Sequence, residues 1–189
     1  AMVVGVGAGE GTLTATLGGK TVKAEVTVNP KSIADATVTL SKTSYSYNGL
    51  AQTPGATVAD GKTELIEGKD YTLSYSDNKN ASGKAKAIVT GKGNYTGTVS
   101  ATFTISKAPL IIKAKDWTIT YGDKPANNGA TFTGLVAEET ESDLDGELAF
   151  SYDYKQYDDV GEYTITPGGL TSGNYQITWT DGALTVEQK

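Results

Sequence analysis

Cysteine, histidine and arginine are all absent from this chain of 189 residues, and its 16 basic residues are all lysines. Without cysteine there are no disulfide bonds and no thiol nucleophile, and without histidine the commonest general acid or base near neutral pH is missing. Without arginine, no guanidinium can hold a phosphate or a carboxylate through two parallel hydrogen bonds. We therefore expect a protein that is not an enzyme.

Basic charge is also scarce relative to acidic charge. The 16 lysines stand against 22 aspartates and glutamates, which gives a net charge of -6. Nucleic-acid binding depends on clustered basic side chains that neutralise phosphates, so we expect no nucleic-acid partner. No run of apolar residues approaches the roughly 18 that a membrane-spanning helix needs. We expect no membrane insertion within this fragment, no cofactor, and a monomer.

The residues that are abundant favour β-strands. The chain has 23 glycines but only 5 prolines and 1 methionine, and threonine is frequent. This composition is typical of strands that are joined by tight turns. The length exceeds what one small sandwich needs, so we expect more than one core. The sequence predicts a mainly β protein made of tandem modules.

Alternation of apolar and polar residues gives the strand positions. Val99, Ala101, Phe103 and Ile105 alternate with serine and threonine, which predicts a strand with one buried and one exposed face. Short pairs of turn-forming residues predict hairpin turns at Gly18-Gly19, Asp60-Gly61 and Asp181-Gly182. Residues 137–145 are the exception, because glutamate and serine replace β-branched residues there. We predict a short helix in that segment, ending near Gly146.

Two blocks of the sequence contain the same motifs in the same order. The first contains Tyr45-Ser46-Tyr47-Asn48-Gly49, then Gly93-Asn94-Tyr95, and closes with Phe103-Thr104-Ile105. The second contains Ile119-Thr120-Tyr121-Gly122-Asp123, then Gly173-Asn174-Tyr175, and closes with Leu184-Thr185-Val186. Internal similarity of this kind indicates related modules. We predict a partial Ig-like module in residues 1–29, a first β module in residues 30–107 and a second in residues 108–189.

These motifs carry a resemblance to known families. Residues 36–106, with Gly68-Lys69-Asp70-Tyr71 and Gly93-Asn94-Tyr95, resemble a repeat that is common in clostridial, Gram-positive surface proteins. Residues 109–187, with Tyr121-Gly122-Asp123 and Gly173-Asn174-Tyr175, resemble the MBG-type extracellular module. Residues 5–28 are similar to the closing strands of a bacterial Ig-like domain. The resemblance implies tandem Ig-like or β-sandwich modules, or grasp-like α+β units, at a bacterial cell surface or cell wall.

Ten acidic residues between positions 137 and 162 stand against one lysine, Lys155. Most of them alternate with apolar residues, which favours a solvated strand face. A glycosidase would need two of these carboxylates facing each other across a cleft, and no spacing selects such a pair. Asp143, Asp145 and Glu147 surround a glycine with hard oxygen ligands, so they form a weak calcium candidate.

Aromatic residues are the usual means of binding sugar rings, and the chain has 11 tyrosines and 2 tryptophans. Most share the parity of the apolar strand positions, so we predict a core role for Trp117, Trp179, Tyr152, Tyr154 and Tyr163. Tyr157 and Phe132 fall outside clean alternation and are the weak candidates for an exposed ligand platform. Tyr95 and Tyr175 each follow Gly-Asn, where a phenol could bond a backbone group.

Two functions remain open from the sequence. The first is a non-enzymatic structural or adhesive stalk module of a secreted or cell-surface bacterial protein. Its partners would be the neighbouring modules of the same chain and, at the tip, a host or environmental glycan or protein. The alternative is a carbohydrate-binding or spacer appendage of a secreted polysaccharide-degrading enzyme.

Overall fold

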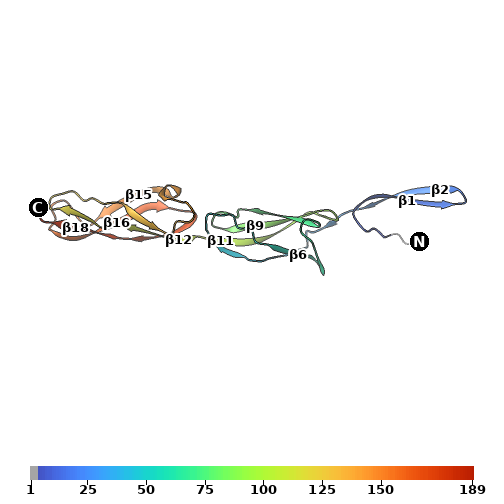
Figure 1. Cartoon of the computed structure of the whole chain (residues 1–189), viewed down its shortest axis with the longest axis horizontal. Helices are drawn as coiled ribbons and strands as arrows, with labels where there is room; N and C mark the ends of the chain where they lie inside the picture. Colours follow the sequence, from blue (N-terminus) through green and yellow to red (C-terminus); the bar gives the residue numbers. More distant parts are fainter. Residues whose placement is uncertain (1–3) are drawn as a thin grey trace. The chain divides into compact units, whose positions relative to one another are not determined.

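The computed structural model describes residues 4–189 and is mainly β, as predicted (Figure 1). In this part of the chain the helical structure is a single 3₁₀ turn, η1 (Glu141–Asp143), and no helix is long and apolar enough to span a membrane. The chain forms two compact units. Unit 1 contains the described residues up to Tyr45 together with residues 52–78 and 82–104, and unit 2 contains residues 46–51, 79–81 and 105–189.

The first eleven strands form four sheets. They are β1 (Gly9–Leu17), β2 (Lys20–Val28), β3 (Lys31–Ser32), β4 (Thr37–Leu40), β5 (Ser44–Ser46), β6 (Ala56–Asp60), β7 (Thr63–Glu64), β8 (Tyr71–Ser76), β9 (Ser82–Gly91), β10 (Tyr95–Thr96) and β11 (Thr98–Ser106). The strand orders are β1-β2, β10-β3, β4-β6-β7 and β5-β11-β9-β8. The hairpin predicted at Asp60-Gly61 is present, since Asp60 pairs with Thr63.

The hairpin of β1 and β2 turns at Gly18-Gly19, as predicted, with Leu17 paired to Lys20. Its side chains are exposed except for two half-buried valines near the end of β2. Leu17 is 88% exposed and Val22 is 69% exposed. A two-stranded ribbon with no second layer buries little apolar surface, so this hairpin has no core of its own.

The core of unit 1 lies between its two larger sheets. Val58 of β6 is fully buried and packs with Tyr71 of β8 and Val89 of β9. The alternation predicted for β11 is confirmed, because Phe103 is buried while the polar residues between its apolar positions are exposed. Strands from two sheets thus place their apolar faces against one another, which is the arrangement of a β-sandwich.

Unit 2 contains two further sheets. Its strands are β12 (Ala108–Ala114), β13 (Trp117–Thr120), β14 (Ala130–Thr133), β15 (Asp145–Tyr152), β16 (Gly161–Thr171), β17 (Tyr175–Thr180) and β18 (Gly182–Glu187). The strand orders are β14-β12-β17 and β13-β18-β16-β15. The pairs β12 with β17 and β13 with β18 are parallel, and the other pairs described in these sheets are antiparallel.

Side chains from both sheets of unit 2 meet in one core. Ala114 of β12 packs with Ile119 of β13, Ile165 of β16 and Leu184 of β18. Along β12, buried and exposed residues alternate without a break, so one face of this strand is wholly committed to the core. The absence of an α-helix from residues 4–189 favours the sandwich over the grasp-like α+β alternative.

Two sequence predictions on unit 2 are wrong. Asp181-Gly182 is not a hairpin turn, because β17 and β18 belong to different sheets and the chain crosses between them here. A Cβ on Gly182 would lie 2.6 Å from the carbonyl oxygen of Ala114, so this glycine permits a close backbone approach. Trp117 shares the parity of Ile119, yet it is 40% exposed because it is the first residue of an edge strand.

The helix predicted within residues 137–145 is present only as the 3₁₀ turn η1. The side chain of Asp143 accepts a hydrogen bond from the backbone N–H of Thr140 over 2.7 Å. The backbone N–H of Asp143 in turn donates to the carbonyl oxygen of Thr140 over 3.1 Å. Leu144 is already extended, with φ -95° and ψ 155°, and β15 begins at Asp145. The strand therefore starts before a second helical turn can form.

Candidate functional site

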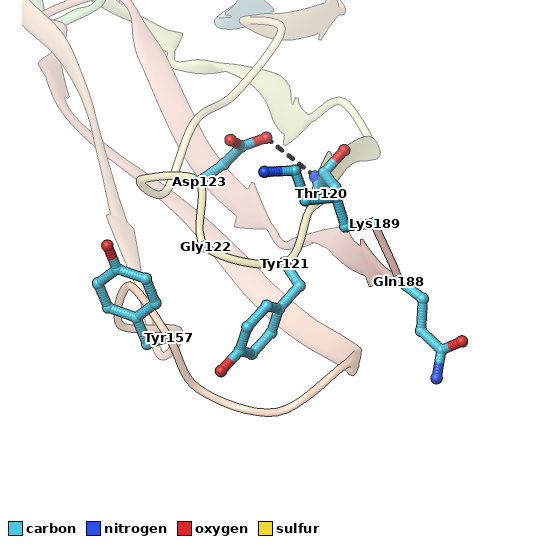
Figure 2. Close-up of a pocket in the computed structure, with 7 residues that line it drawn as sticks. All are labelled: Thr120, Tyr121, Gly122, Asp123, Tyr157, Gln188 and Lys189. Atoms are coloured by element: carbon cyan, nitrogen blue, oxygen red, sulfur yellow. Dashed lines mark hydrogen bonds between the residues drawn. The ribbon is translucent and has the colours of Figure 1, made fainter.

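A pocket lies in unit 2 where strands β13 and β18 end. It is a solvent-open hollow of about 720 Å³, a volume within the range of about 300–1,000 Å³ that is usual for small-ligand sites. The residues that line it are Thr120, Tyr121, Gly122, Asp123, Tyr157, Gln188 and Lys189 (Figure 2). Figure 2 shows the two tyrosine side chains next to each other, with Gln188 pointing away from them.

The Tyr121-Gly122-Asp123 motif is a tight turn that ends β13. The carboxylate of Asp123 accepts a hydrogen bond from the backbone N–H of Thr120 over 3.0 Å, and the N–H of Asp123 donates to the carbonyl oxygen of Thr120 over 2.9 Å. The N–H of Tyr121 donates to the carbonyl oxygen of Glu187 over 2.8 Å. These bonds fix the backbone on both sides of the Tyr121 side chain, so the ring projects from a rigid position.

Gly122 brings the second tyrosine close. Its φ is +90°, a left-handed value that favours glycine. A Cβ at this position would lie 3.4 Å from the ring of Tyr157, and the side-chain amide of Gln156 donates to the carbonyl oxygen of Gly122 over 2.7 Å. The rings of Tyr121 and Tyr157 meet edge to face, with centroids 6.3 Å apart and planes at 68°. A Cβ at position 122 would thus be in ordinary contact with the ring, and a substitution there would be strained by the backbone φ instead.

Tyr157 itself has an unfavourable backbone conformation. Its φ is 76°, and a bulky residue other than glycine is seldom found in the left-handed region. A local turn imposes this value: the N–H of Lys155 donates to the carboxylate of Asp158 over 2.8 Å, and the N–H of Asp158 donates to the carbonyl oxygen of Lys155 over 2.9 Å. Tyr157 is 67% exposed, so burial of its ring does not offset the strain.

A buried tyrosine supports the pocket from inside the unit. Tyr154 is 2% exposed, and its hydroxyl donates to the carbonyl oxygen of Asp123 over 3.2 Å. Its ring packs edge to face against Tyr163 at a centroid distance of 5.0 Å. The hydroxyl of Tyr163 donates to the carbonyl oxygen of Asp159 over 2.8 Å, and burial raises its pKa. The core aromatics thus hold both pocket loops in place.

The pocket can supply stacking surface and phenolic hydrogen bonds. Tyr121 is 44% exposed and Tyr157 is 67% exposed, and aromatic faces of this kind bind apolar groups, sugar rings or other aromatic rings. Its carboxylate, on Asp123, is already bonded to a backbone N–H. Across residues 4–189 no group of three or more acidic side chains is placed to hold a metal ion.

The predicted site residues fall in different places. Tyr157 lies in the pocket, whereas Phe132 is half-buried in β14, outside it. Asp143, Asp145 and Glu147 are exposed and are not gathered into one metal-binding group; a calcium titration is still the direct test of that candidate. Tyr121 was not among the predicted site residues. The sequence did contain a signal for Tyr121, because this residue lies at the end of an alternating run and directly before a glycine.

A second tyrosine cluster in unit 2 is buried. The hydroxyls of Tyr47 and Tyr175 both donate to the carboxylate of Glu139, and their rings meet edge to face at 5.5 Å and 84°. The hydroxyl of Tyr175 also accepts the backbone N–H of Val136 over 2.9 Å, which agrees with the backbone contact expected of this residue. Tyr47 is 4% exposed and Tyr175 is 3% exposed.

This cluster shifts the ionisation of its phenols. Burial and, after it, the hydrogen bond to the Glu139 carboxylate raise the pKa of Tyr47 to about 12. Burial and the same carboxylate raise the pKa of Tyr175 to about 12. Both phenols therefore stay protonated as hydrogen-bond donors at any physiological pH. Sequence reasoning missed Glu139 because it placed this residue in a run of solvated acids.

Fold and pocket together define unit 2 as a β-sandwich module with an exposed tyrosine pair at the end of an edge strand. Residues 110–185 match the family model described as the MBG domain (YGX type). The predicted MBG-type module is therefore confirmed for this part of the chain, and Tyr121-Gly122-Asp123 is a Tyr-Gly-X motif within it. No curated protein matches the chain significantly. The resemblances of the preceding residues to a clostridial repeat and to an Ig-like domain stay predictions.

Proposed function

We propose that the chain is a non-enzymatic structural module of a secreted or cell-surface bacterial protein, which carries tension and spaces an adhesive part from the cell. The match of residues 110–185 to the MBG domain supports a repeat module of the surface-protein type. The observation that carries the mechanical role is the pairing of the strands at the two ends of unit 2. Residue 108 begins β12 and residue 187 ends β18, and each strand has a parallel neighbour.

Parallel pairing affects how the unit resists force. In a ladder the hydrogen bonds lie across the strands, so a pull along β12 and β18 loads several bonds at once. The hairpin of β1 and β2 is the opposite case, because Gly9 is paired with Val28 and the two ends of the hairpin are adjacent. A pull on those ends separates the bonds one after another.

Single-molecule stretching of the chain by its two ends tests this proposal, with the hairpin as an internal control. We expect unit 2 to unfold in one step at a force well above that which opens the hairpin. Gradual extension of unit 2 at the same low force as the hairpin would contradict a tension-carrying role.

The exposed tyrosine pair favours a second candidate function, a carbohydrate-binding or spacer appendage of a polysaccharide-degrading enzyme. A glycan array probed with the wild type and Tyr157→Ala tests it. Trp117→Ala is the matched control, since Trp117 is an exposed aromatic outside the pocket. Binding that is lost in Tyr157→Ala and kept in Trp117→Ala would favour this candidate, and silence of the wild type on the array would favour the structural role.

A further inference from the structure

Tyr47 and Tyr121 occupy equivalent positions in the fold. Tyr47 comes directly after β5, and its N–H donates to the carbonyl oxygen of Ser106 at the end of β11 over 2.8 Å. Tyr121 comes directly after β13, and its N–H donates to the carbonyl oxygen of Glu187 at the end of β18 over 2.8 Å. Strand β5 is the edge neighbour of β11, as β13 is of β18. The repeated sequence motif is therefore also a repeated structure.

The loops beside the two tyrosines are equivalent as well. In the loop before β9, the side-chain amide of Asn78 donates to the carbonyl oxygen of Gln52 over 2.8 Å. In the loop before β16, the side-chain amide of Gln156 donates to the carbonyl oxygen of Gly122 over 2.7 Å. In both cases an amide ties this loop to the segment that follows the tyrosine. Each tyrosine thus belongs to a two-segment surface.

The first of these surfaces is covered within unit 2, which includes residues 46–51 and 79–81. Glu139 and Tyr175 bond and pack against Tyr47. A Cβ on Gly49 would lie 3.2 Å from the Cβ of Ala137. The backbone N–H of Ala81 donates to the side-chain oxygen of Asn174 over 2.9 Å. The groups that cover this surface are named here the receiving surface: Val136, Ala137, Glu139, Asn174 and Tyr175.

The second surface has no such cover. Tyr121 is 44% exposed, compared with 4% for Tyr47. Tyr157, in the neighbouring loop, is 67% exposed. Both residues line the pocket of Figure 2. Unit 2 therefore contains a receiving surface that is occupied by Tyr47. It also contains an equivalent tyrosine, Tyr121, that no such surface covers.

We propose that the Tyr121–Tyr157 pocket is a docking site for a further unit of the same kind, which presents its own receiving surface. The incoming carboxylate equivalent to Glu139 accepts the hydroxyl of Tyr121, and the incoming ring equivalent to Tyr175 packs edge-on against it. Tyr157 adds apolar surface that is covered in the same step. This deepens the proposed structural role, on which it rests, by naming the partner that the pocket recognises.

A second copy of the whole chain does not meet this requirement, because its receiving surface is already occupied by its own Tyr47. The occupant must be a unit whose receiving surface is free. The chain on its own is then expected to stay monomeric even though its pocket is open.

The test is a tandem protein in which residues 1–187 are followed directly by a second copy of residues 107–189. Glu187 corresponds to Ser106 in the repeat, so this join keeps the natural Lys107-Ala108 connection. Tyrosine nitration by tetranitromethane, read by peptide mass spectrometry, measures exposure of Tyr121. Thr118→Ser in the added copy distinguishes the two Tyr121 peptides by mass, and Thr118 is exposed.

In the tandem protein we expect nitration of the first Tyr121 to fall to the level of Tyr47, while Tyr121 of the added copy stays as reactive as in the original chain. Glu139→Ala with Tyr175→Phe in the added copy should restore the reactivity of the first Tyr121. Tyr154 is 2% exposed, so it stays unreactive in the tandem protein only when both copies are folded. Undiminished nitration of the first Tyr121 with Tyr154 unreactive overturns docking. If an added glycan protects Tyr121 of the original chain from nitration, while the added copy in the tandem protein does not protect it, the pocket is a sugar-binding site. Either failure leaves the stretching test of the structural role unaffected.

Discussion

Tyr47 and Tyr121 have the same place in a repeated motif but opposite environments. Tyr47 is 4% exposed, and its hydroxyl donates a hydrogen bond to the carboxylate of Glu139. Tyr121 is 44% exposed, and its ring meets that of Tyr157 edge to face. The backbone bond that holds each tyrosine is the same, with an N–H to carbonyl distance of 2.8 Å. The strand and turn therefore position the ring, and what lies opposite decides whether it is buried or exposed.

The largest effect is expected at alkaline pH, where the stability contributed by the buried tyrosines should be lost. The pKa values of Tyr47 and Tyr175 are about 12 in the folded chain and about 10 when unfolded. Because the folded values are the higher ones, the stability they contribute is complete below pH 10 and is lost as the pH rises toward 12. Two phenolates beside the Glu139 carboxylate would then repel one another.

Denaturant unfolding followed by tryptophan fluorescence measures this loss. The only tryptophans, Trp117 and Trp179, both lie in unit 2, so the signal reports on that unit. The control is the double variant Tyr47→Phe with Tyr175→Phe. We expect the stability advantage of the wild type over this variant to narrow from pH 10 to pH 12. A difference that stays constant over this range would show that the two phenols have the same pKa values in the folded and unfolded chains.

Removing one hydroxyl group at a time compares the stability contributions of Tyr47 and Tyr121 at neutral pH. Tyr47→Phe removes a buried hydrogen bond to a carboxylate and should destabilise unit 2 by about 2 kcal/mol. Tyr121→Phe removes a solvent-exposed hydroxyl and should change stability by less than about 0.5 kcal/mol. Urea unfolding of both variants under the same conditions gives the two numbers. Equal effects would mean that the receiving surface adds nothing specific to Tyr47.

Features that depend on local sequence were predictable. The Gly18-Gly19 hairpin and the alternation around Phe103 follow from turn chemistry and period-two patterning, and both are present. Tyr157 was singled out because it broke the alternation, and it lies in the pocket. In each case the residues that decide the structure are close together in the chain.

Features that depend on distant partners were not predictable. Gly182 is needed because of the Ala114 carbonyl, so an Asp-Gly pair that looks like a hairpin turn is a crossing between sheets. Glu139 is one of ten acids in a run, and only the fold brings two phenols to it. Trp117 has the parity of a core residue, but its place on an edge strand exposes it.

The smallest effect is expected at Tyr157, where the change should be stabilising. Its φ of 76° costs a bulky residue free energy that asparagine largely avoids, because asparagine tolerates the left-handed region. Tyr157→Asn should therefore raise the stability of unit 2 by about 0.5 kcal/mol. Thermal unfolding measures this, with Tyr121→Asn as the control at an exposed tyrosine of ordinary φ. A stabilised variant would show that folding does not require this tyrosine, which leaves binding as the reason for an aromatic ring in a strained and exposed position. A destabilised variant would assign Tyr157 to the packing of its own unit and remove it from the docking surface.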